Sequence, residues 1–415
     1  MADLLGFVSI GLVSLMTILI GLRWSDISKI IYIALSVRII FIFIGHYIVP
    51  LPDSTQDAMG FQELAWSYGK NGFYDALNNF PGINSFFYSW IIGVLYSLLG
   101  RSILMAQSLS LLFGILSIFI AWLFTKKLWD NQTANKVGWV LALFPSLILY
   151  SALPLREVFQ SFFLLIAVIG IYYWVRDYSN RYIFLALFGF IGATFFHGPL
   201  IFGGIVFLLI VFFINFQKMI ISILSLRLDI NAFVFSLIVI FILQYFFLNK
   251  IFIPKIGYFE DLNLGYILRE LNARMIGQSS YGDWAIINSE STLFEIFYKS
   301  ILRIIYFLFS PFPWDVQKPA HIIGMMDGFL YLFLFYLMIC NRKIIWNDIF
   351  LRITFIILLT YFFIFAIGVS NFGAGLRHRS KFVIEIILLI APLIPSSIYF
   401  HKKKIKKFLK KKVKF

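Results

Sequence analysis

Long apolar runs alternate with short polar segments along most of the chain, and this pattern predicts a series of membrane-spanning helices. Such a helix needs about 20 mostly apolar residues, because backbone groups find no hydrogen-bond partners in lipid. The pattern predicts an all-α polytopic membrane protein with about 11 transmembrane helices. The expected spans lie near residues 4–21, 30–49, 103–125, 137–154, 158–175, 182–196, 198–216, 231–249, 322–340, 347–368 and 382–399.

Two shorter apolar runs are expected to lie in the membrane interface instead of crossing the bilayer. The run 84–99 is short for a span and follows Pro81, and the run 300–312 is interrupted by Pro311. If residues 84–99 crossed the membrane, every later basic loop would change sides. An interfacial position for this run therefore keeps the loop charges consistent.

Basic residues assign the loops to the two sides of the membrane, because cytoplasmic loops carry an excess of lysine and arginine. Under this rule the segments 50–102, 250–321 and 369–381 are extracytoplasmic, together with Glu157 and His197. The N-terminus is expected on the same side as these segments. The basic residues expected on the cytoplasmic side are Arg23, Lys29, Lys126, Lys127, Arg176, Arg181, Lys218, Arg227, Arg342, Lys343 and the C-terminal lysines.

The same boundaries predict the organisation of the chain without a separate soluble domain. A transmembrane core carries an acidic first external loop with interfacial helices, and a second external segment precedes the last spans. The expected parts are 1–29 as an extra N-terminal span, 30–250 as the core with the external loop 50–102, 251–321 as the second external segment with an interfacial helix, 322–400 as the C-terminal spans and 401–415 as a polybasic cytoplasmic tail.

The composition indicates a membrane protein, and the distribution of charge predicts which partners it contacts. Hydrophobic residues make up 61% of the chain and charged residues 13%, whereas an ordinary soluble domain is about 25% charged. The formal net charge is +15, and nine lysines lie in the tail between Lys402 and Lys414. This concentration predicts contact with anionic lipid headgroups and not with nucleic acid.

Absent motifs exclude several kinds of chemistry. Cys340 is the single cysteine of the sequence, which rules out a disulfide framework and a cysteine metal cluster. The chain has no phosphate-binding loop, no zinc-protease motif and no dinucleotide-binding motif. We therefore expect no cofactor and no bound metal.

Two acidic residues open the first external loop and are candidates for proton transfer. Asp53 and Asp57 are four residues apart, and Asp57, Phe61 and Ala65 share one face of a predicted helix. A carboxylate at this position suits a general base that acts on a hydroxyl. The alternative is helix capping, with Ser54 and Asp57 as a capping box and Asp53 as an N-cap. Spacing alone leaves both interpretations open.

A second acidic position, Glu157, follows Arg156 at the outer junction of two spans. One interpretation is a first-turn acid that the helix dipole favours, with Arg156 as its neutralising neighbour. The other is a second carboxylate that faces Asp57 across a cleft, where the proximity of two carboxylates would raise one pKa. These two interpretations also remain open.

A basic cluster is expected on the outer side at Arg377, His378 and Arg379. This position is unusual, because basic residues normally concentrate in cytoplasmic loops. Guanidinium groups offer paired donors to phosphate oxygens, so the cluster predicts a lipid-phosphate site; the alternative is contact with headgroups. Glu385, in the following helix, is a candidate for orienting one of the arginines. His197 is a further candidate for phosphate binding, and no histidine spacing supports a metal.

The order of these motifs resembles the GT-C superfamily of integral membrane glycosyltransferases, particularly the branch of protein O-mannosyltransferases and the bacterial aminoarabinose transferase. The resemblance covers roughly residues 30–215, and the remainder follows loosely. It rests on Asp57-Phe61-Ala65 in the first external loop, the helix from Pro81 to Leu98-Leu99-Gly100, the span from Phe144-Pro145-Ser146 to Leu155-Arg156-Glu157 and the late Arg377-His378-Arg379.

The chain departs from the family pattern at several positions. Phe61 replaces the usual tyrosine, Gln107 replaces an arginine, and Asn79-Phe80-Pro81 stands where some relatives have a metal-binding motif. His197 stands where a basic residue is common in a middle span.

The resemblance implies an enzyme of the bacterial plasma membrane with its active site on the extracytoplasmic face. It would move a sugar or glycan from a polyprenyl-phosphate or diphosphate donor to a hydroxyl of a saccharide, lipid or protein acceptor, in cell-surface polysaccharide or glycoconjugate synthesis. Catalytic roles would fall to Asp57 and Glu157. Two alternatives are a polymerase of polysaccharide repeat units and a transporter or flippase of a lipid-linked saccharide. A transporter would show inverted repeats and charges in mid-span, which the sequence does not suggest.

Overall fold

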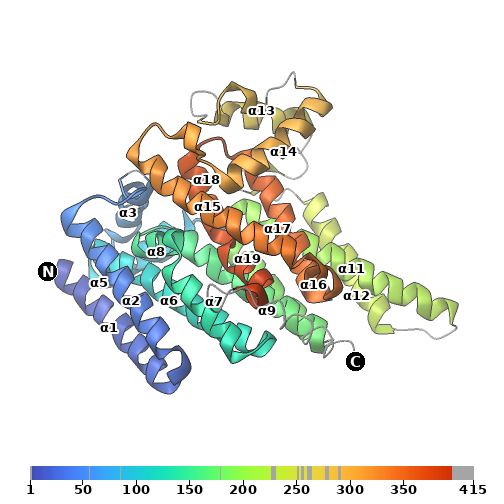
Figure 1. Ribbon diagram of the computed structural model, residues 1–415, viewed down its shortest axis with the longest axis horizontal. Coiled ribbons are helices and arrows are strands. Elements are labelled where there is room, and N and C mark those ends of the chain that lie inside the picture. The colour runs from blue at the N-terminus through green and yellow to red at the C-terminus, as the bar shows by residue number, and fades with distance from the viewer. Residues whose placement is uncertain are drawn as a thin grey trace.

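Helices make up almost all of the regular structure of this protein, as the computed structural model shows (Figure 1). The predicted polybasic tail 401–415, with its expected contact to anionic lipids, lies outside the residues that the structure describes. The described residues are 2–55, 57–84, 86–177, 179–225, 230–249, 252–253, 257–258, 264–275, 280–287 and 291–394.

Seven helices within these residues are long and apolar enough to cross a membrane. They coincide with seven of the expected spans, so the prediction of an all-α polytopic membrane protein is confirmed at this level. They are α1 (Ala2–Arg23), α2 (Ser25–Phe43, continued by the π-helical turn Ile44–Ile48), α6 (Ile103–Leu128), α9 (Glu157–Asp177), α11 (Ile201–Leu224, after the 3-10 turn Gly198–Leu200), α15 (Pro319–Cys340) and α17 (Ile349–Gly368).

Three of the other four expected spans correspond to shorter or interrupted helices, and the fourth corresponds to a continuous helix of 19 residues, α12. The total of about 11 crossings and the GT-C-like arrangement stay predictions, because helix lengths alone do not fix either. The helices are α7 (Asn131–Leu143) with α8 (Pro145–Ala152), α10 (Arg181–Phe196), α12 (Ile230–Leu248) and α19 (Val383–Ile390, followed by the 3-10 turn Ala391–Leu393).

The expected span 137–154 is wrong as one continuous helix, because the chain breaks at Phe144. Its backbone is extended, with φ −67° and ψ 121°, as expected for a residue before proline. Pro145 has no N–H to donate into the preceding turn. The freed carbonyls accept hydrogen bonds from the buried side chain of Arg38, whose Nη1 donates to Ala142 O at 2.8 Å and whose Nη2 donates to Leu141 O at 3.2 Å.

Two short amphipathic helices match the runs predicted to lie in the interface. The helix α5 (Phe87–Leu99) packs on α3 (Asp57–Gly69), and α4 (Phe73–Asn78) joins them. The helix α14 (Leu293–Phe309) begins earlier than expected, since Thr292 and Glu295 form a capping box. Both α5 and α14 are shorter than the roughly 20 residues that a span requires.

The loops that were predicted to share the cytoplasmic side contact one another at one end of the bundle. Lys126 Nζ lies 2.9 Å from Asp26 Oδ2, and Arg176 Nη2 lies 2.6 Å from Asp348 Oδ2. Lys127 Nζ lies 2.9 Å from the Tyr173 hydroxyl. Figure 1 shows α13 (Leu264–Met275), α14 and α18 (Phe372–Arg379) in the upper part of the view, above α16 (Arg342–Asn347). The assignment of the first group to the extracytoplasmic side stays a prediction.

The core is built around α19, whose residues are all buried. A helix that is apolar on every side belongs in the interior, and α19 packs against α9, α15 and α17. The segment that precedes it, α18 with the 3-10 turn Ser380–Phe382, therefore lies where α9 and α15 begin. The remaining short elements are β1 (Phe252–Ile253), paired antiparallel with β2 (Gly257–Tyr258), and the 3-10 turns Asp283–Ala285 and Pro313–Asp315.

Candidate active site

Three charged residues from distant parts of the chain meet at one end of the bundle. Arg377 Nε donates a hydrogen bond to Glu157 Oε1 at 2.7 Å. Nη1 of the same side chain donates to Asp57 Oδ2. One guanidinium thus joins the two acids that the sequence singled out as catalytic candidates.

Local structure explains why these side chains point at one another. Asp57 is the first residue of α3 and Glu157 is the first residue of α9. Carboxylates are favoured there by the positive end of the helix dipole. Arg377 lies in the last turn of α18, where the negative end favours a cation, and Asn371 caps the start of that helix. Helix ends of complementary charge preference therefore face one another.

The three side chains differ strongly in exposure. The side chain of Glu157 is 1% exposed and that of Arg377 is 10% exposed, whereas that of Asp57 is 58% exposed. The bond between Glu157 and Arg377 therefore lies in the protein interior, and Asp57 faces the outside. Burial alone lowers the pKa of Arg377, but Glu157 and Asp57 outweigh it and hold this pKa above its usual value.

The two acids do not interact in the way the sequence suggested. One of the two interpretations of Glu157 had it face Asp57 directly, so that repulsion would raise the pKa of one carboxyl. Instead the guanidinium of Arg377 stands between Asp57 and Glu157 and offsets that repulsion. The side chain of Glu157 is buried and bonds Nε of Arg377, so its position suits the orientation of that guanidinium.

The capping interpretation of the first loop is corrected by the start of α3. The helix begins at Asp57 itself, so Asp57 is not the third residue of a helix capped by Ser54. Asp53 lies in a turn with φ +63°, in the left-handed region that aspartate tolerates better than most residues. Its Oδ2 accepts a hydrogen bond from the Tyr150 hydroxyl at 2.9 Å. Burial raises the pKa of Asp53, while that hydrogen bond and the charge of Arg377 act in the opposite direction.

Arg156 joins α3 to the start of α9 through an aromatic contact. The side chain is 3% exposed, and its guanidinium lies 5.2 Å from the ring centre of Phe61. Phe61 also packs edge-on against Tyr88 on α5, with ring centres 5.8 Å apart. The aromatic residue four positions after Asp57 therefore helps to hold α3 over the site.

His197 and His378 lie together beside the arginine cluster. Their ring centres are 5.1 Å apart, and both rings contact Phe365. His378 Nδ1 lies 2.7 Å from Nζ of Lys381, which is fully buried. Lys381 belongs to the same basic stretch of the sequence but was not assigned to phosphate binding. It lies four residues after Arg377, which places the two on one helical face.

Arg379 does not share the site of Arg377. Its guanidinium bonds Asp327 Oδ2 at 3.0 to 3.1 Å and the carbonyls of Leu308, Ser310 and Gly324 at 3.1, 2.6 and 3.0 Å. Residues two apart on a helix point about 200° apart, so a helical α18 separates the two arginines. The expectation that both bind one phosphate is wrong in its geometry. Arg379 fastens α14 and α15 to α18.

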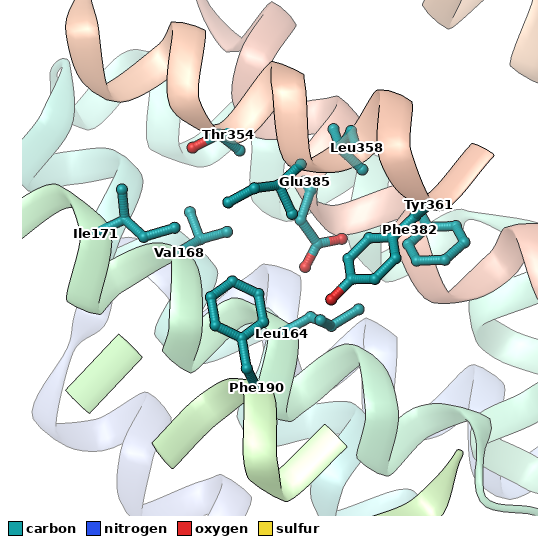
Figure 2. Close-up of a pocket in the computed structure, with 10 residues that line it drawn as sticks. Leu164, Val168, Ile171, Phe190, Thr354, Leu358, Tyr361, Phe382 and Glu385 are labelled. Atoms are coloured by element: carbon teal, nitrogen blue, oxygen red, sulfur yellow. The ribbon is translucent and has the colours of Figure 1, made fainter. Parts of the chain in front are cut away.

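Glu385 does not orient an arginine, which corrects the prediction for this residue. Figure 2 shows its carboxyl group among the side chains of Leu164, Val168, Phe190, Tyr361 and Phe382. Neither carboxylate oxygen has a hydrogen-bond partner within the described part of the chain. Glu385 is eight positions after Arg377, which corresponds to about 12 Å along an α-helix.

No three His, Cys, Asp or Glu side chains among the described residues lie close enough to hold a metal ion. The site as described consists of an exposed acid, a buried acid, a shared guanidinium and nearby basic groups. This arrangement can accept a proton at Asp57 and can stabilise negative charge near Arg377.

Comparison with known proteins adds no relatives: no protein-family model, no curated protein and no solved structure matches the chain. Two features of the chain itself indicate a function: the arrangement of Asp57, Glu157 and Arg377, and the resemblance of the sequence motifs.

Proposed function

We propose that this protein is a glycosyltransferase of the GT-C type. It takes a sugar or glycan from a polyprenyl-phosphate or diphosphate donor and joins it to an acceptor hydroxyl at the extracytoplasmic face of a bacterial plasma membrane. One observation carries the proposal: Arg377 joins Asp57 and Glu157 at one end of a helical membrane bundle. An accessible base beside a cation is what transfer from a lipid phosphate needs.

The reaction follows from the exposure of these groups. The acceptor oxygen attacks the anomeric carbon and forms the new glycosidic bond, while the bond from that carbon to the phosphate oxygen breaks. The acceptor proton moves to the carboxylate of Asp57, which is 58% exposed. The electron pair of the broken bond leaves on the lipid phosphate.

Arg377 stabilises the leaving phosphate, because a guanidinium keeps its charge and aims paired donors at oxygen atoms. Glu157 holds that guanidinium in place through the buried hydrogen bond to Nε. Lys381 lies beside it and adds to the positive field, and its ammonium group contacts Nδ1 of His378. The donor supplies the driving force, so no nucleotide takes part.

The acceptor is expected near α14. This helix contacts α18, and the backbone N–H groups of Ser280 and Tyr281 donate to Ser370 O close to the start of α18. The second external segment thus borders the candidate site on the side of the arginine. A saccharide chain that contacted this segment would make the enzyme a polymerase of repeat units with the same chemistry.

The experiment that tests the proposal uses purified protein in nanodiscs with sugar-labelled polyprenyl-phosphate donors and a panel of saccharide acceptors. We expect transfer by the wild type and loss of transfer in Asp57→Asn, with the donor still bound. Full transfer by Asp57→Asn would refute the base assignment. Movement of intact donor across the bilayer without sugar transfer would show that the protein is a transporter and would contradict the proposed enzyme.

A further inference from the structure

The guanidinium of Arg377 is shared by two carboxylates that hold it with unequal firmness. Glu157 is 1% exposed and binds Nε at 2.7 Å, whereas Asp57 is 58% exposed and binds Nη1. A buried acid that lost its partner would keep an uncompensated charge in the interior. An exposed acid that lost its partner would gain water in exchange, and exposed ion pairs are weak. Asp57 is therefore the partner that can leave.

Charges near Arg377 bear on which anion can hold the position of Asp57. Arg377, Lys381 and Arg156 act on Glu157 through their charges, and Asp53 is a further carboxyl on which Arg377 acts. The second negative charge in contact with Arg377 comes from the exposed side chain of Asp57. Another anion that reached this place could take over the same role.

Contact with Arg377 limits Asp57 as a base. Oδ2 of Asp57 is occupied by the guanidinium, which leaves Oδ1 as the oxygen that can accept the proton of an acceptor hydroxyl. The proposed reaction also places the donor phosphate against Arg377. The carboxylate and the phosphate thus compete for the same donors on one side chain.

We propose that the phosphate of the lipid donor displaces Asp57 from Arg377, so that donor binding itself releases the catalytic base. This inference rests on the function proposed above. The exchange is non-covalent: the hydrogen bond from Nη1 to a carboxylate oxygen is replaced by one to a phosphate oxygen, and no proton changes place. Glu157 keeps its bond to Nε throughout. Donor binding therefore frees both carboxylate oxygens of Asp57 for the acceptor hydroxyl.

The test measures binding of a polyprenyl monophosphate to the full-length protein in nanodiscs, with the uncharged polyprenol as reference for the tail. Asp57→Asn and Asp57→Ala remove the competing charge, and the exposed position lets both variants fold. We expect about three- to tenfold tighter binding of the polyprenyl phosphate than in the wild type, since a charge-assisted hydrogen bond no longer competes. Binding of polyprenol should not change.

Glu63→Gln is the matched control. Glu63 lies on the same helix α3, its side chain is 65% exposed, and it pairs with Arg101 at 2.6 Å, away from Arg377. This variant removes one negative charge from the same surface and should change phosphate binding less than about twofold. An equal gain in affinity for polyprenyl phosphate in Glu63→Gln and Asp57→Asn would show that any loss of negative charge from this surface has the same effect. That result would overturn the exchange.

Inorganic phosphate, used as a second probe, identifies the exchanging group. A gain in Asp57→Asn with both probes supports exchange by phosphate alone, and a gain only with the lipid supports exchange by a tail-anchored headgroup. Unchanged or weaker lipid binding in both Asp57 variants would overturn the exchange and leave the proposed function standing. Absence of polyprenyl-phosphate binding in the wild type and in every variant would instead contradict the proposed donor, and with it the proposed function.

Discussion

Nε of Arg377 donates a 2.7 Å hydrogen bond to Oε1 of Glu157, and this bond joins α18 to the first residue of α9. The two residues are 220 positions apart in the chain. Both side chains lie in the interior, so each depends on the other for compensation of its charge. The contact is at once a long-range constraint on the fold and the support of the candidate active site.

Removal of one member of this pair should destabilise the protein strongly. We expect Arg377→Gln to lower the free energy of unfolding by about 3–5 kcal/mol, because Glu157 is left buried without its partner. The double variant Arg377→Gln/Glu157→Gln should recover part of this loss. Asp57→Asn should cost less than about 1 kcal/mol, since Asp57 is exposed. Denaturant or SDS unfolding in mixed micelles measures all of these variants, and a double variant no more stable than Arg377→Gln would contradict the pair as the cause.

The sequence located the members of this site because their positions carry information. Asp57 and Glu157 were expected at helix starts, and Arg377 was conspicuous as a positive charge on the outer side. Loop charges then placed all of them at one end of the bundle. The direct bonds among them depend on tertiary packing, which local patterns do not contain.

Other parts of the structure were outside the reach of sequence patterns. Arg379 was grouped with Arg377. The partners of Arg379 lie on α14 and α15, and they become visible only once those helices are packed. Arg38 was not singled out, because nothing local indicates that it serves a chain break at Pro145 on another helix. Glu385 was assigned to the arginines by its distance along the sequence, and the side chain turns into the apolar interior.

Stability should depend on pH through Asp53. Burial raises the pKa of this carboxyl in the folded protein, so between the ordinary aspartate pKa of about 3.9 and the raised value the folded state binds more protons than the unfolded state. The contribution of Asp53 to stability is therefore fully present below the ordinary value and is lost as pH rises through the raised value. Asn tolerates the left-handed backbone at this position, and Asp53→Asn should flatten the decline.

Tyr150→Phe provides the opposite test of the same group. The Tyr150 hydroxyl donates to Asp53 Oδ2 and lowers the carboxyl pKa. Without this bond the decline in stability should move to higher pH. Thermal unfolding across a pH series measures both variants; identical profiles for wild type, Asp53→Asn and Tyr150→Phe would show that Asp53 does not titrate in this way.

Replacement of Glu385 by a residue without polar atoms should stabilise the protein. Its carboxyl oxygens have no hydrogen-bond partner in the described part of the chain and lie among apolar side chains (Figure 2). We expect Glu385→Met to raise the free energy of unfolding by about 1–3 kcal/mol, while Glu385→Gln, which keeps a polar group, gains little. Sugar transfer should persist in both variants. A stable Glu385→Met protein that had lost transfer would give this carboxyl a role in the reaction.

The buried side chain of Arg38 should be needed only because Pro145 interrupts the helix that faces it. Arg38→Met keeps the length of the side chain but leaves the carbonyls of Leu141 and Ala142 without donors in the interior, at a cost of about 2–4 kcal/mol. Pro145→Ala restores an N–H for the helix, so the double variant should recover part of the loss.

Recovery of sugar transfer in this double variant should lag behind recovery of stability. The break sets the direction of α8, and α8 carries Tyr150, whose hydroxyl contacts Asp53 beside the site. Unfolding and transfer measured on the same four proteins decide this; equal recovery of both would show that the break serves packing alone.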